Sequence, residues 1–203
     1  MPRPKKTEMQ LEQTRAHILE AAYAILQEAG PQALTSRAIA ERLGIAHMSL
    51  FHDCFENQAA ILSALREREV AKIRLQLQAL EQLAASQDIL AVLREALLVP
   101  IRYARENPNL YYLAWVMPEA VGENQEQGRH RLQATVQQLA HLIQMGMEQG
   151  QLARRDPMLA AVTVLGMVNM PVILFYSGKL VDPDLRDRML PEALSAALGY
   201  LTR

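Results

Sequence analysis

Apolar side chains recur at three- and four-residue intervals over most of the chain, which is the period of an amphipathic helix. The first such run covers residues 10–29 and stops at Gly30-Pro31, a pair typical of a helix end. Further runs, each bounded by a capping residue, a glycine or a proline, are predicted over residues 36–43, 46–54, 58–85, 89–107, 110–117, 125–149, 157–176 and 184–201. The sequence contains no alternating strand pattern and no internal repeat, so it predicts an all-α protein of about nine helices.

Composition supports a folded, intracellular protein. Half of the 203 residues are apolar and the net charge is −1, which argues against intrinsic disorder. The single cysteine, Cys54, excludes an internal disulfide and fits a reducing compartment. The charged start of the chain is not followed by the apolar core of a signal peptide, so we expect a cytoplasmic protein.

Residues 34–53 predict two short helices joined by a turn, which is the helix-turn-helix arrangement. Thr35 or Ser36 is expected to cap the first helix, and Gly44 lies where the turn requires a left-handed backbone. Four apolar side chains are expected to fill the wedge between the helices, namely Ile39, Leu43, Ile45 and Leu50. The side chains left outside are donors and small groups, which suit a recognition helix that reads base edges in the major groove.

The same region carries a family pattern. Its residues are Thr14-Arg15, Ile18-Leu19, Ala21-Ala22, Glu28, Gly30, Thr35-Ser36, the run from Ile39 to Ile45, Ser49-Leu50-Phe51 and Phe55. With these residues, the segment 13–65 resembles the TetR family of bacterial transcriptional regulators. The resemblance implies a homodimer, a pseudo-palindromic DNA operator and a C-terminal pocket whose small-molecule ligand releases the DNA. A repressor is the role expected from it.

Carried over by position, the second helix of the pair would be the recognition helix. The resemblance and the outward-facing positions together predict contacts with double-stranded DNA from Thr35, Ser36, Arg37, His47, Met48, Ser49, Phe51 and His52. Lys5 and Lys6 form a basic arm that could contact phosphates, although a solvated chain terminus explains the same charges.

The sequence departs from the family pattern at three places. Phe51 replaces the usual tyrosine, and Gln58 replaces a common basic residue. Three residues instead of two separate Phe51 from Phe55, and one extra helical residue rotates the residues after it by about 100°. Either the recognition helix is one residue longer or Cys54 takes the core position of Phe55.

Two further roles remain open from the sequence. Residues 1–55 carry six basic and six acidic side chains, whereas DNA-binding domains are usually strongly basic. A ligand-binding helical module with weakened DNA binding is therefore one alternative. An activator of the same fold is the other, because the sign of regulation depends on the position of the operator.

The segment from Met158 to Tyr176 is apolar enough to suggest a membrane span, with Thr163 and Asn169 as the polar side chains besides the Tyr176 hydroxyl. Pro171 and the lack of basic clusters on both flanks favour instead a helix buried at a subunit interface. No membrane partner is expected. The predicted dimer interface consists of Leu159, Val162, Leu165, Val168, Leu194 and Leu198.

Aromatic and methionine side chains gather in residues 110–117 and in later helices, which is typical of an adaptable apolar pocket or of an ordinary core. The candidate pocket residues are Arg102, Tyr103, Tyr111, Tyr112, Trp115, Met145, Met167, Asn169, Met170 and Phe175. The pattern does not identify the effector.

Catalytic and metal-binding motifs are not found. The five histidines are scattered, and neither a phosphate-binding glycine loop nor a nucleophile elbow occurs. We therefore predict no catalytic residues, no metal and no cofactor. The expected organisation is a basic arm (1–10), a DNA-binding domain (11–71) and a helical regulatory and dimerisation domain (72–203).

Overall fold

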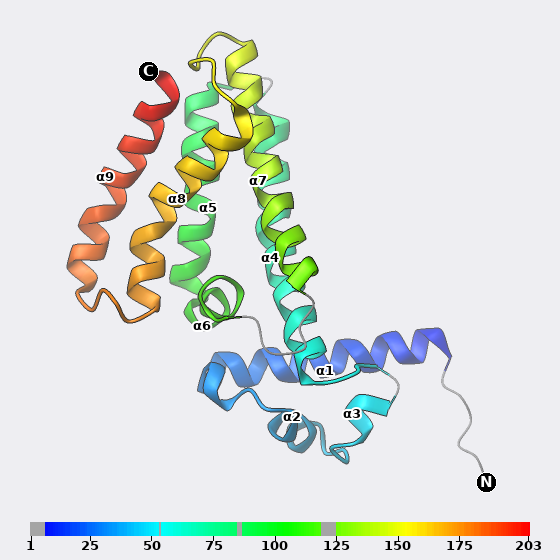
Figure 1. The fold of residues 1–203 in the computed structure, drawn as a ribbon. Coiled ribbons are helices and arrows are strands. Elements are labelled where there is room, and N and C mark those ends of the chain that lie inside the picture. Colours follow the sequence, from blue (N-terminus) through cyan, green and yellow to red (C-terminus); the bar gives the residue numbers. More distant parts are fainter. Residues whose placement is uncertain (1–6, 53, 85–86, 119–124) are drawn as a thin grey trace. The chain divides into compact units, whose positions relative to one another are not determined.

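The computed structural model describes residues 7–52, 54–84, 87–118 and 125–203 (Figure 1). These residues form no strand, and the predicted all-α class of about nine helices is confirmed. The α-helices are α1 (Glu8–Ala29), α2 (Ser36–Leu43), α3 (Ser49–His52), α4 (Gln58–Leu83), α5 (Ile89–Glu106), α6 (Pro108–Tyr111), α7 (Gln125–Glu148), α8 (Pro157–Tyr176) and α9 (Pro183–Thr202). A 3₁₀ turn, η1 (Pro31–Ala33), and a π-helix, η2 (Tyr112–Val116), complete the order of elements.

Capping side chains set several of these boundaries. Helix α1 begins earlier than predicted because Thr7 and Gln10 form a capping box, in which each side chain accepts a hydrogen bond from the other residue's backbone amide. Thr35 accepts from the amide of Ala38 at 3.1 Å, as expected for the cap of α2. Asp88 caps α5 in the same way, accepting from Leu90.

The predicted recognition helix over residues 46–54 begins too early. The α-helix covers Ser49–His52, and the residues before it form a turn in which Ser49 N donates to Ala46 O at 2.8 Å. The wedge also differs, because Ile39 and Leu50 are fully buried whereas Ile45 is 38% exposed. The backbone amide of Ile45 closes the turn onto Ala40 O, and its side chain faces solvent.

The described chain divides into two compact units. Among the described residues, the N-terminal unit comprises 7–52, 54–68, 118 and 125, and the C-terminal unit comprises 69–84, 87–117 and 126–203. In the N-terminal unit, α1 packs against α2, and α2 packs against α3. Its buried core consists mainly of Ile18, Ala22, Leu26, Ile39, Leu50, Phe55, Leu62 and Leu65.

In the C-terminal unit, α8 and α9 lie side by side and α8 also packs against α5 (Figure 1). Helix α8 is long and apolar enough to cross a membrane by length and composition alone, with a mean hydropathy of 2.1. One of its faces is nevertheless part of the unit's own core, because Ala160, Val164 and Val168 are fully buried.

Burial corrects the predicted dimer interface. Val168 and Leu194 face the core of their own chain and cannot meet a partner. Leu165 and Leu198 are half-buried, whereas Leu159 and Val162 are 63% and 54% exposed. The helical period of α8 explains the difference, since residues four apart share a face and Val164 and Val168 lie on the inner one.

Candidate functional site

The helix-turn-helix is built around a left-handed glycine. Gly44 adopts φ 65° and ψ 29° at the end of α2, and its amide donates to the carbonyls of Ala40 and Glu41. A residue with a Cβ atom is disfavoured in this conformation, so glycine allows the sharp turn into α3. The turn leaves the outer surfaces of α2 and α3 without a covering element among the described residues of the N-terminal unit.

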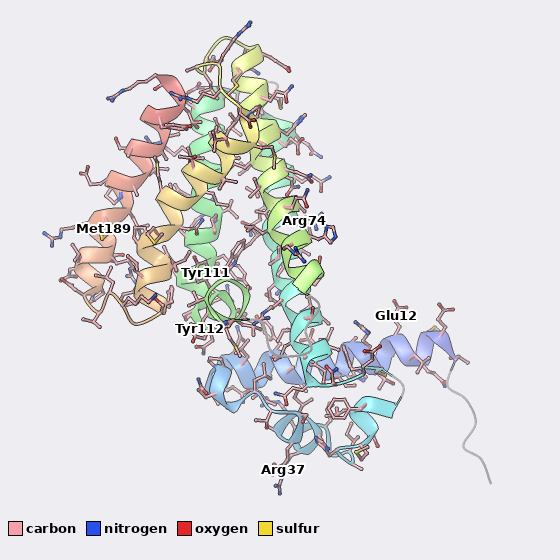
Figure 2. The ribbon with its side chains drawn as sticks, in the orientation of Figure 1. Glu12, Arg37, Arg74, Tyr111, Tyr112 and Met189 are labelled. Atoms are coloured by element: carbon pink, nitrogen blue, oxygen red, sulfur yellow. The ribbon has the colours of Figure 1, made fainter. Side chains whose placement is uncertain are left out.

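The predicted DNA-contact residues lie mostly on that outer surface. Thr35, Arg37, His47 and Met48 are exposed, and Ser36, Ser49 and Phe51 are half-buried. Arg37 extends away from α2 into solvent (Figure 2). Lys5, Lys6 and the side chain of His52 lie outside the described residues.

Two of these residues contact each other across the turn. The Ser36 Oγ lies 2.8 Å from His47 Nε2, a hydrogen-bonding distance that joins the start of α2 to the turn before α3. The His47 ring also packs edge-on against Phe51, with ring centroids 5.4 Å apart. These two contacts hold the imidazole in place at the outer surface formed by α2 and α3.

Charge pairing distinguishes the arginines of the N-terminal unit. Arg42 donates to both carboxylate oxygens of Glu28, at 2.7 and 2.6 Å. This hydrogen-bonded pair holds the pKa of Glu28 below its usual value. Arg37 makes no ion pair with any described residue, so its charge remains available at the surface.

The structure excludes one of the two alternatives for the extra residue after Phe51. Phe55 is 5% exposed and keeps its core position, while Cys54 is half-buried, so Cys54 does not displace it. Arg15 of α1 donates to the Cys54 carbonyl at 3.1 Å, and its guanidinium lies 4.4 Å from the centre of the Phe55 ring. The C-terminal end of the predicted recognition helix lies outside the described residues, because residue 53 is not among them.

Gln58 has a structural role in place of the basic residue that is common there. Its side-chain amide donates to the Leu34 carbonyl at 3.1 Å. The first turn of α4 is thereby joined to the segment that leads into α2.

In the C-terminal unit, three of the predicted pocket residues form a connected cluster. The Tyr111 hydroxyl donates to Asn169 Oδ1 at 3.2 Å, and the Tyr111 and Trp115 rings stack with centroids 6.3 Å apart. Figure 2 shows Tyr111 on α6, next to the π-helix that carries Trp115. Burial raises the pKa of Tyr111 well above its usual value, so its hydroxyl stays protonated.

An enclosed pocket, which we call the α4–α8 pocket, lies beside this cluster. Its lining consists of Ile73, Leu77, Ala96, Pro100, Trp115, Thr135, Leu139 and Leu165. The sequence pattern predicted only Trp115 among them as a pocket residue, and it placed Leu165 in the interface. The other six belong to ordinary amphipathic helices, and Pro100, a proline inside α5, was the one local signal.

The remaining predicted pocket residues lie elsewhere. Tyr103 donates to the buried carboxylate of Glu69 at 2.6 Å, and exposed Arg102 pairs with Glu95. Phe175 packs under the Arg186 guanidinium at 4.3 Å. Met145 and Tyr112 are half-buried outside the pocket lining, whereas Met167 and Met170 line an open groove between α8 and α9.

That groove has a volume of about 720 Å³ and faces outward from the unit. It is lined by Met167, Met170, Pro171, Leu185, Arg188, Met189, Glu192, Ala193 and Ala196. Among the described residues, no group of histidine, cysteine or acidic side chains could hold a metal ion.

Comparison with known proteins agrees with this geometry. Residues 18–65 match the family model of bacterial regulatory proteins of the tetR family, and residues 85–190 match the model of the tetracyclin repressor-like C-terminal domain. The comparison with curated proteins finds no match.

Several solved structures share the fold. A TetR-family transcriptional regulator from Pectobacterium atrosepticum is 21% identical with a TM-score of 0.73, covering 98% of this chain and 99% of that one. The fatty acid degradation regulator FadR from Bacillus halodurans is 18% identical with a TM-score of 0.71, covering 96% of each chain. PfmR from Thermus thermophilus is 22% identical with a TM-score of 0.62, covering 92% of this chain and 99% of that one.

The C-terminal model alone spans more than half of the chain, and the N-terminal model coincides with the helix-turn-helix described above. The chain therefore belongs to the TetR family of bacterial transcriptional regulators, which bind DNA and are not enzymes.

Proposed function

We propose that this protein is a cytoplasmic, homodimeric repressor that binds a pseudo-palindromic operator and releases it when a small molecule binds the C-terminal unit. The observation that carries the proposal is the exposed face of the helix-turn-helix. There, Arg37 has no ion-pair partner among the described residues, and His47 and Met48 are exposed at the entry to α3. Such a face suits one phosphate contact beside a set of base-edge contacts.

The dimer is supported by an apolar stripe on α8. Leu159, Val162, Gly166 and Met170 follow one another at three- and four-residue spacing, and all four are exposed. The stripe adjoins the groove lined by Met167 and residues of α9. A second copy of the chain, packing its own α8 and α9 there, would form a four-helix bundle and remove the stripe from water.

The same groove argues against a lipid-facing α8. Arg188 and Glu192 belong to its lining, and charged side chains are costly in the hydrocarbon core of a bilayer. A protein partner with a polar rim can accommodate them, since interface rims remain solvated.

In the proposed dimer, two recognition helices occupy successive major grooves about 34 Å apart. A ligand that favours a conformer with a different spacing weakens operator binding. A tenfold change in occupancy requires about 1.4 kcal/mol of differential affinity between the two conformers. Occupancy of an operator that overlaps a promoter then blocks transcription.

The function is tested by selecting bound sequences from a random duplex pool with the full-length protein at moderate salt, together with its mass in solution. We expect a dimer that enriches an inverted repeat. A soluble dimer that enriches no sequence would contradict the proposal and favour a ligand-binding module without a DNA partner. Placing the recovered repeat upstream of a promoter, instead of across it, would separate an activator from a repressor.

The phosphate contact is tested by Arg37→Ala. Loss of one contact lowers the slope of log affinity against log salt by about 0.9 per protomer, and it weakens binding to all sequences alike. Arg154→Ala removes the same charge from an exposed position in the C-terminal unit and should leave the slope unchanged. An unchanged slope in Arg37→Ala would show that this residue does not contact a phosphate.

A further inference from the structure

The α4–α8 pocket is apolar and nearly closed. Its enclosed volume is about 10 Å³, room for about one water molecule. None of its lining residues is charged, and its side-chain polar groups are the Thr135 hydroxyl and the Trp115 indole N–H. One of the lining side chains, Leu165, is half-buried and so has room to move outward.

The indole N–H of Trp115 is a buried donor without an acceptor. Its Nε1 is inaccessible to solvent and makes no hydrogen bond with any described residue. Buried donors in proteins are nearly always satisfied, so this one points to a group that is supplied from outside the chain.

The surrounding structure holds that donor in place. Trp115 stacks on Tyr111, whose hydroxyl donates to Asn169. The Asn169 amide in turn donates to the Leu165 carbonyl at 3.1 Å, and Leu165 is part of the pocket lining. The π-helix η2 that carries Trp115 is a rare element, and such segments occur frequently at functional sites.

One backbone carbonyl of α5 lacks its helical donor. Pro100 has no amide hydrogen, so it cannot donate to the Ala96 carbonyl as an ordinary residue of α5 would. Ala96 and Pro100 both line the pocket. The lining thus includes the tryptophan that carries the unpaired donor and the two residues of α5 between which the helical hydrogen bond is missing.

We propose that the α4–α8 pocket binds an uncharged, mostly apolar small molecule whose carbonyl oxygen accepts a hydrogen bond from Trp115 Nε1. This inference rests on the proposed function, because the molecule is the effector of that regulator. A carboxylate or an ammonium group is excluded from the lining, since burying an unpaired charge there is costly. The ligand is larger than one water, so its entry displaces the Leu165 side chain outward while Trp115 keeps its stacking on Tyr111.

Trp115 is the only tryptophan of the chain, so the indole N–H gives a single resonance in a nitrogen-edited proton spectrum. Three probes with the same ring separate the possibilities: methyl cyclohexanecarboxylate, cyclohexanecarboxylate and ethylcyclohexane. We expect the ester to move the indole proton downfield and to bind about tenfold or more tightly than the carboxylate. We expect ethylcyclohexane to bind without the downfield shift. No response to the ester at millimolar concentration, or equal binding of the carboxylate, would overturn the proposal.

Trp115→Phe keeps an aromatic ring against Tyr111 and removes the donor. Its affinity for the ester, measured by the thermal shift of the full chain, should fall by about tenfold, with ethylcyclohexane binding unchanged. Tyr112→Phe, next to the pocket lining on η2, is the matched control and should bind all three probes as the unmodified protein does. An equal loss of ester and hydrocarbon binding in Trp115→Phe would mean that the indole only fills space. If this variant does not fold, the indole resonance of the unmodified protein decides alone.

Operator binding separates this inference from the proposed function. If the protein enriches an inverted repeat but its indole does not respond to the ester, only the ligand class is wrong. If the indole responds and no DNA is enriched, the proposed ligand site is supported and the proposed DNA-binding function is contradicted.

Discussion

At the scale of single residues, Glu69 of the C-terminal unit is an acidic side chain buried in the core. Its side chain is fully buried, accepts a hydrogen bond from the Tyr103 hydroxyl at 2.6 Å and pairs with Lys72 Nζ at 2.7 Å. A buried carboxylate is tolerated when such partners replace its water. Tyr103, which the pattern suggested as a pocket residue, therefore stabilises the fold.

Tyr103→Phe should destabilise the protein by about 1.5–3 kcal/mol, because a hydrogen bond to a buried charge is lost and the ring is kept. Chemical denaturation of the full chain measures this change. Tyr200→Phe is the matched control, since its ring packs under Arg155 at 4.2 Å and that contact survives in phenylalanine. Equal stability of the two variants would show that the Tyr103 hydroxyl contributes nothing measurable.

At the scale of elements, the helix-turn-helix and the proposed ligand pocket each depend on a departure from regular α-helix. The left-handed Gly44 separates α2 from α3, and the five-residue π-helix η2 carries Trp115. The chain after η2 reaches Pro118, whose carbonyl accepts a hydrogen bond from buried Arg66 of the N-terminal unit at 3.1 Å. The pocket residue Trp115 therefore lies three positions before Pro118, which is hydrogen-bonded within the N-terminal unit.

Gly44→Ala should destabilise the helix-turn-helix by about 1 kcal/mol, because alanine is disfavoured at a φ of 65°. No atom lies within 4 Å of a Cβ built there, so the cost is conformational and not steric. Gly199→Ala makes the same change inside α9, also in open space, and should raise stability by about 0.5–1 kcal/mol. Thermal unfolding measures both, and the same sign in the two variants would contradict the backbone argument.

At the scale of the whole molecule, burial divides α8 into two faces with different roles. The inner face, with Ala160, Val164 and Val168, belongs to the core of the C-terminal unit. The outer face carries Leu159 and Val162 into solvent. An exposed apolar stripe of this kind is typical of an interaction surface, and the proposed dimer covers it.

Val162→Glu should convert the proposed dimer into a folded monomer, because the charge would be buried without a partner at the interface. Light scattering gives the mass, and circular dichroism verifies the fold. Val181→Glu makes the same change at a position that is 82% exposed outside the stripe, and it should remain a dimer. Val164→Glu, on the inner face, should unfold the C-terminal unit instead. A normal dimer in Val162→Glu would place the interface elsewhere.

The sequence by itself determined the features whose interactions are local. Local interactions set the helix period, the caps at Thr35 and Asp88, and the turn at Gly44. Because the partners lie within a few residues of each other, a short stretch of sequence contains both of them. The family pattern of the helix-turn-helix is local in the same sense, which is why the family was predicted correctly.

Only the tertiary structure decided which residues meet across long separations. Arg15 donates to the Cys54 carbonyl from 39 residues away, and its guanidinium packs against the ring of Phe55 in the core. Tyr111 meets Asn169 from 58 residues away, and the pocket draws its lining from four α-helices and η2. A helical pattern shows that α8 is apolar on every side, but which side faces its own core depends on the helices packed against it. That packing buries Val168 and leaves Val162 exposed. It also encloses the α4–α8 pocket, whereas the groove between α8 and α9 stays open to solvent.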